Sequence, residues 1–79
     1  MYEKPPTQML AEKLREARGL DYTLAYNALK YHLKGLDDIS FLKEMTEVDN
    51  PDIFRYLWSA GLPYKQQQIA VQRWKELTE

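Results

Sequence analysis

The chain has only three glycines, and a leucine follows each of them: Gly19, Gly35 and Gly61. Glycine reaches the left-handed conformation that ends a helix at little cost, and the next apolar residue can pack back against that helix. An aspartate or a proline, both residues that start helices, comes directly after each leucine. The pattern therefore predicts short helices joined by very tight turns.

Hydrophobic spacing between these turns has the helical period, and no segment alternates with the period of a strand. We expect an all-α fold, a compact bundle of about five short helices over residues 8–18, 22–34, 38–46, 51–60 and 63–77. Helix 22–34 is apolar around most of its circumference, so we expect it to be the central one. Residues 1–6 are predicted to form a flexible N-terminal arm, and residues 7–79 a single helical domain.

Several start signals and one face can be assigned in more detail. Thr7 and Asp21 are predicted N-caps, and so is Asp37 or its neighbour. Asn50-Pro51-Asp52 combines a capping side chain, a proline at the first helical position and an acid in the first turn. In helix 63–77, one face is predicted to point inward and Ile69 to lie opposite it, exposed. That inward face consists of Tyr64, Ala70, Val71, Trp74 and Leu77.

Composition excludes several classes of protein. The chain has no cysteine, so neither disulfides nor thiolate metal sites can stabilise it. Apolar runs are too short for a membrane span or a signal peptide, which predicts a cytoplasmic, intracellular protein without membrane contact. Residues 35–54 carry one Lys or Arg against six Asp or Glu, between two more basic ends. This split charge suits a protein partner, including a second copy of the chain.

Residues for catalysis are few. The single histidine, His32, falls on the apolar face of helix 22–34, where a bond to a backbone carbonyl or a tyrosine is expected. Asp37 and Asp38 stand where a helix needs a cap, and neither Ser40 nor Ser59 sits in a nucleophile elbow. The spacings typical of metal ligands and of phosphate-binding loops are absent from the sequence. We therefore expect no catalytic site, no cofactor and no metal.

DNA binding is the alternative function. Helix 63–77 would then act as the recognition helix of a helix-turn-helix-like regulator. Donors for phosphates and base edges are available on it. They are Lys65, Gln66, Gln68, Gln72, Arg73 and Lys75.

One stretch resembles a known family. Residues 14–20 read LREARGL, and Ala28-Leu29 and Gly35 follow at the spacing of the first two helices of ubiquitin-associated-like modules. In that family, the turn between the first two helices and the third helix form a protein-binding surface. The resemblance implies such a surface here, made of Arg18, Gly19, Leu20, Phe41 and Leu42.

The function predicted first is protein binding. We expect a small non-catalytic interaction or regulatory module of bacterial or viral type, which binds through an apolar and aromatic patch with a charged rim. Self-association as a homodimer is one form of this binding. The predicted anchors are Arg18, Leu20, Tyr64, Ile69, Arg73 and Trp74.

Overall fold

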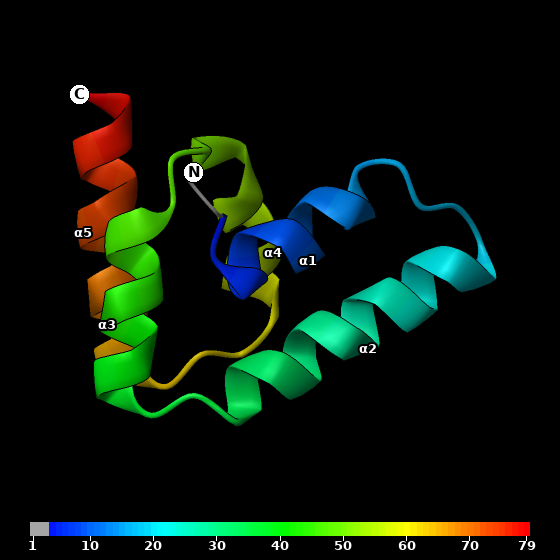
Figure 1. Cartoon of the computed structure of the whole chain (residues 1–79), viewed down its shortest axis with the longest axis horizontal. Helices are drawn as coiled ribbons and strands as arrows, with labels where there is room; N and C mark the ends of the chain where they lie inside the picture. The colour runs from blue at the N-terminus through cyan, green and yellow to red at the C-terminus, as the bar shows by residue number, and fades with distance from the viewer. Residues whose placement is uncertain (1–3) are drawn as a thin grey trace.

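The computed structural model describes residues 4–79, which form an all-α fold with no strand in that range (Figure 1). Its elements are α1 (Pro6–Leu14), α2 (Leu20–Lys34), α3 (Asp38–Glu47), the 3-10 turn η1 (Pro51–Ile53), α4 (Phe54–Ser59) and α5 (Tyr64–Thr78). The prediction of five short helices is confirmed. Of the predicted arm, residues 1–3 lie outside the described residues, Pro5 is buried and Pro6 already belongs to α1.

Every element contributes to one apolar core. Its buried members are Ala11, Leu14, Leu29, Leu33, Phe41, Met45, Val48, Ile53, Phe54, Tyr56, Leu57, Leu62 and Ala70. The most extensive contact between two helices joins α1 to α2, so α2 is central by contacts, as predicted. Figure 1 shows α3 and α5 side by side and α2 extending away from this pair, with its first turns farthest from it.

The predicted glycine turn is confirmed in full at Gly61 and in part at Gly35 and Gly19. Gly61 has φ 79°, and Leu62 after it is buried, as the pattern predicts. Gly35 is the C-cap of α2, which ends at Lys34 as predicted, but its φ of −82° is right-handed and not left-handed, and its N–H bonds to the carbonyls of Tyr31 and His32. Gly19, at φ 56° and ψ −128°, stands before the first residue of α2 and does not end α1.

α1 ends at Leu14, four residues before the predicted end. Arg15, Glu16 and Arg18 are exposed and Ala17 is only partly buried, so no fully buried side chain lies between Leu14 and α2. The prediction that Leu20 packs back against α1 was wrong, because it begins α2 and is 73% exposed. Asp21 does not cap α2, which has no side-chain cap.

Glu44 performs the capping task that the sequence assigned to Thr7. The Thr7 hydroxyl is buried without a hydrogen-bond partner, whereas its backbone N–H donates to Glu44 Oε1 at 2.9 Å. The other carboxylate oxygen lies 3.0 Å from His32 Nε2, within hydrogen-bond distance. His32 thus bonds to a carboxylate, and the predicted carbonyl or tyrosine partner was wrong. One side chain of α3 therefore joins α1 and α2.

Two predicted helix starts are confirmed. The Asp37 carboxylate accepts the N–H of Ser40 at 2.7 Å and caps α3. The Asn50 side chain accepts the N–H of Asp52 at 3.0 Å, with Pro51 as the first residue of η1. The predicted helix 51–60 is divided at Phe54: the Asn50 cap begins the 3-10 turn η1, and α4 follows it.

Of the predicted inward face of α5, Ala70 is fully buried and Leu77 packs against the core, but Tyr64, Val71 and Trp74 are exposed, so the buried side is rotated by about a quarter turn from the predicted one. Tyr64 is exposed, while Ile69 packs against the core and Gln66 is buried. Two polar residues of the inward side find carbonyl acceptors on other elements. Gln66 Nε2 donates to Leu36 O at 3.2 Å, and the Arg73 guanidinium donates twice to Val48 O, at 3.0 and 2.7 Å. Polarity therefore does not mark the outer side of this helix.

The glycines differ enough for a matched test. Gly61→Ala should destabilise the fold by about 1–2 kcal/mol, because an L side chain resists the left-handed conformation. Gly35→Ala should be neutral or stabilising by up to about 1 kcal/mol, since its new Cβ meets only ordinary contacts, the nearest at 3.6 Å. Urea unfolding of both variants measures the difference. Equal effects would contradict the assigned conformations.

The Glu44 bridge predicts a second loss. Glu44→Ala leaves the buried Thr7 N–H without an acceptor and should lower the free energy of unfolding by about 1–3 kcal/mol. Lys43→Ala, at the exposed neighbouring position of α3, is the control and should change it by less than about 0.5 kcal/mol. Chemical denaturation compares the two, and similar losses would show that Glu44 does not hold the helices together.

Candidate interaction surfaces

The six predicted anchors do not form one surface. Ile69 and Arg73 of α5 line a groove of about 380 Å³ between α3 and α5. Leu42 and Met45 of α3 form its opposite wall. Arg18 and Trp74 line two separate but neighbouring hollows near the C-terminal end of α1, Arg18 in one and Trp74 in the other. Tyr64 is exposed at the start of α5, and Leu20 at the start of α2. Arg73 is held by Val48 O, which makes it part of the internal bonding between α5 and the link after α3.

The alternative nucleic-acid face of α5 is reduced in the same way. Gln66 is buried and Arg73 is bonded to Val48, so neither can reach a base edge or a phosphate without leaving its partner. The remaining four residues, Lys65, Gln68, Gln72 and Lys75, are exposed. Glu76 on α5 and Glu79 at its C-cap are exposed and oppose phosphate binding.

The surface implied by the ubiquitin-associated-like resemblance is also incomplete. Arg18, Gly19 and Leu20 are exposed and Leu42 is half-exposed, but Phe41 is fully buried in the core. Phe41 was therefore wrongly placed on that surface. No family model, no curated protein and no solved structure matches this chain.

The largest run of exposed apolar side chains within one helix lies on α2. Leu20, Leu24 and Tyr31 are 73%, 58% and 84% exposed. At 100° per residue they fall within about 40° of one another, on the side opposite the buried Leu29. We call these three residues the outer stripe of α2. The sequence predicted that other helices would cover this side, but α2 is covered on one side only.

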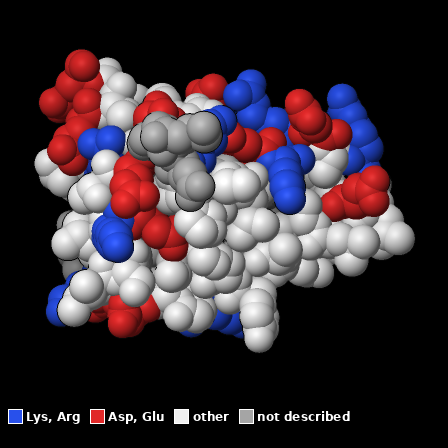
Figure 2. Space-filling view, viewed as in Figure 1, with Lys and Arg blue, Asp and Glu red and all other residues white. Residues whose placement is uncertain are grey.

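Charge is sparse along the outer stripe. Asn27 and Ala28 are the exposed residues between Leu24 and Tyr31 on this side of the helix. Asp21 lies in the first turn of α2 and Lys34 in the last. Figure 2 shows broad uncharged surface over much of α2, with acidic and basic side chains gathered toward its ends.

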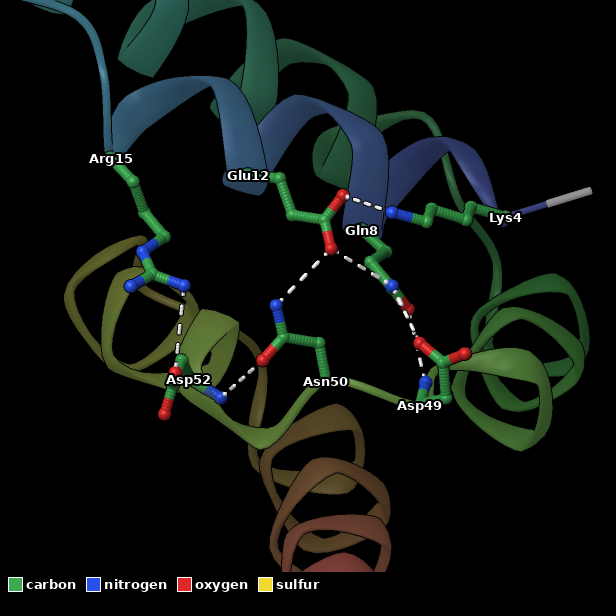
Figure 3. A network of polar contacts seen from close by, with 7 residues as sticks. All are labelled: Lys4, Gln8, Glu12, Arg15, Asp49, Asn50 and Asp52. Atoms are coloured by element: carbon green, nitrogen blue, oxygen red, sulfur yellow. Dashed lines mark hydrogen bonds and ion pairs between the residues drawn. The ribbon is translucent and has the colours of Figure 1, made fainter.

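A polar network joins α1 to the link between α3 and η1 (Figure 3). Glu12 Oε2 accepts from the amides of Gln8 and Asn50, both at 3.1 Å, and Oε1 lies 3.0 Å from Lys4 Nζ. The buried Gln8 side chain also donates to Asp49 Oδ1 at 2.7 Å and accepts the backbone N–H of Asp49 at 3.0 Å. The oxygens of Glu12 are thus committed to neighbours within the fold.

The network sets the ionisation of Glu12. Burial by itself raises the pKa of this carboxyl, but the hydrogen bonds from Asn50, Lys4 and Gln8 outweigh it, and the net pKa lies below the ordinary value of 4.5. Such a carboxylate is suited to holding two segments together and unsuited to accepting a proton near neutral pH. Within residues 4–79, no group of three His, Cys, Asp or Glu side chains could hold a metal ion. None of the helices in that range has the length and apolar character needed to cross a membrane.

The lowered pKa gives a pH-dependent prediction. Because the folded-state pKa of Glu12 lies below its unfolded value, its stabilising effect is complete above about pH 4.5 and is lost as pH falls through the folded value. Glu12→Gln should therefore destabilise the protein near neutral pH, and this difference should shrink in acid. Urea unfolding at a series of pH values measures it, with Glu16→Gln as the control for loss of an exposed charge. A difference that stays constant or grows in acid would refute the prediction.

Proposed function

We propose that this protein is a small non-catalytic protein-interaction module that binds a second copy of itself through the outer stripe of α2. The observation that carries the proposal is the exposure of Leu20, Leu24 and Tyr31 on the side of α2 that the fold leaves uncovered. Monomeric proteins expose single apolar residues routinely, but several large ones aligned on one side of a helix are typical of an interface.

The order of residues along α2 suits antiparallel pairing of two copies. With a two-fold axis near Asn27, at the middle of the helix, Leu24 of one copy lies opposite Tyr31 of the other. The two Asn27 amides then meet at the axis, where a polar pair fixes the register of paired helices. The end that carries Asp21 lies beside the end that carries Lys34, so unlike charges become neighbours. Parallel pairing would place like charges together.

The size of the stripe predicts a weak dimer. Covering two leucines and one tyrosine on each copy removes on the order of 400 Å² of surface per copy. Stable interfaces bury about 800 Å² per partner. We therefore expect dissociation in the micromolar range or weaker, on the order of 10⁻⁵ M. Association of this strength responds to the local concentration of the protein, which suits a regulatory role.

Sedimentation velocity or light scattering over a wide range of concentration tests the proposal. The mean mass should rise from the monomer value of 9.4 kDa toward twice that value. Leu24→Glu places two like charges in the paired stripe and should weaken association by at least about tenfold, which corresponds to about 1.4 kcal/mol.

Ile39→Glu is the matched control, because Ile39 is as exposed as Tyr31 but lies on α3. It should associate as the parent does. Both substituted residues are exposed, so neither variant should lose its fold, and circular dichroism verifies this. A parent chain that stays monomeric up to millimolar concentration, or a Leu24→Glu variant that associates like Ile39→Glu, would overturn the proposal.

A further inference from the structure

Two neighbouring hollows lie beside the end of α1 and α4, one bounded also by the start of α2 and the other by η1 and α5. The larger, of about 480 Å³, has Arg15, Arg18 and Arg55 in its wall. The smaller, of about 380 Å³, has Trp58 and Trp74 in its wall. Arg15 and Arg55 line both, so the arginines and the tryptophans form one continuous surface.

The larger hollow favours an anion. No aspartate or glutamate is among its lining residues, although Glu16 and Asp21 are close in the sequence. Asp52, which lines the smaller hollow, lies 3.5 Å from Arg15, in a pair whose two side chains are more than half exposed and which therefore contributes little. Three guanidinium groups around one hollow suit a doubly charged group with several oxygens, because each presents a fork of N–H donors.

One of these arginines is already held in place. Arg55 Nη2 donates to the hydroxyl of Tyr56 at 2.7 Å, and its guanidinium lies 4.8 Å from the centre of the Tyr56 ring. Tyr56 is buried, so it gives Arg55 a fixed support. The same hydrogen bond raises the pKa of Arg55. A donor positioned before binding loses less conformational entropy when the ligand arrives.

The smaller hollow presents flat aromatic surface. Trp58 and Trp74 are 43% and 40% exposed, and Trp58 leans on the buried Phe54 ring at a centroid distance of 5.7 Å. Half-exposed indoles beside arginines are the combination that binds nucleotides, because bases stack on the rings and phosphates bond to the guanidinium groups.

We propose that this surface binds a nucleotide unit, with its phosphate among Arg15, Arg18 and Arg55 and its base against Trp58 or Trp74. The unit can be a free mononucleotide or one residue of a single strand, since both present the same phosphate and base. The proposal is independent of self-association, because Tyr22 reaches the larger hollow from the side of α2 opposite the outer stripe.

The two tryptophans provide the readout, because the chain contains no others. A proton–nitrogen spectrum of the labelled protein resolves their two indole N–H signals, and Trp58→Phe assigns them. Titration with adenosine monophosphate should shift at least one of these signals to saturation. Adenosine and inorganic phosphate, titrated separately, should each bind at least about fivefold more weakly, since each loses one half of the contacts. A single-stranded oligonucleotide forms a further arm: tighter binding than the mononucleotide identifies a strand as the source, and equal or weaker binding identifies the free nucleotide.

Arg18→Gln tests the phosphate half, because Arg18 is exposed and its loss should leave the fold intact. It should weaken binding of the mononucleotide about fivefold or more. Lys43→Gln removes one charge from an exposed site on α3 and should leave binding unchanged. The proposal is overturned if neither indole signal responds, if phosphate alone binds as well as the nucleotide, or if Lys43→Gln weakens binding as much as Arg18→Gln.

Discussion

The Glu44 carboxylate is the contact on which the arrangement of the first three helices depends. It accepts a hydrogen bond from the first turn of α1 and holds the imidazole of α2, while its own backbone belongs to α3. α1 has no side-chain cap of its own and depends on this tertiary acceptor to satisfy a buried N–H. The Gln8 and Glu12 network performs a similar task at the other side of α1, toward the link after α3. Hydrogen bonds between polar side chains thus fix how the helices are placed around the apolar core.

Local signals in the sequence were sufficient for much of the fold. The Asn50 and Asp37 caps act within four residues, so their side chains suffice to place the starts of η1 and α3. The left-handed turn at Gly61 is local in the same sense. Gly35 shows the limit of this reasoning, because a glycine permits the left-handed conformation without requiring it. At Gly35, the backbone hydrogen bonds that continue the helical pattern favour the right-handed conformation.

The candidate surfaces were harder to predict, because they depend on which side of a helix meets the rest of the chain. In α5, Gln66 and Arg73 point inward and donate to the carbonyls of Leu36 and Val48. The spacing of residues within α5 does not reveal that these acceptors are present. α2 was expected to be covered because it is apolar around most of its circumference, yet in this fold apolar surface remains exposed along its outer side. The sequence did single out Arg18 and Trp74, but only the folded chain brings Arg15, Arg55 and Trp58 beside them.

The one-sided packing of α2 also bears on its dynamics. No residue between Leu20 and Ala28 is fully buried, whereas Leu29 and Leu33 anchor the second half of the helix. The first half of α2 is held by its own backbone hydrogen bonds, by the partly buried Ala25 and Tyr26, and by the hydrogen bond from the Tyr26 hydroxyl to Ser59. With no fully buried side chain in this half, we expect its amide hydrogens to exchange through local fraying. A partner that covers this half would slow that exchange without altering the core. The exchange rate at the start of α2 would therefore show whether this surface is occupied, while the rest of the molecule stays unchanged.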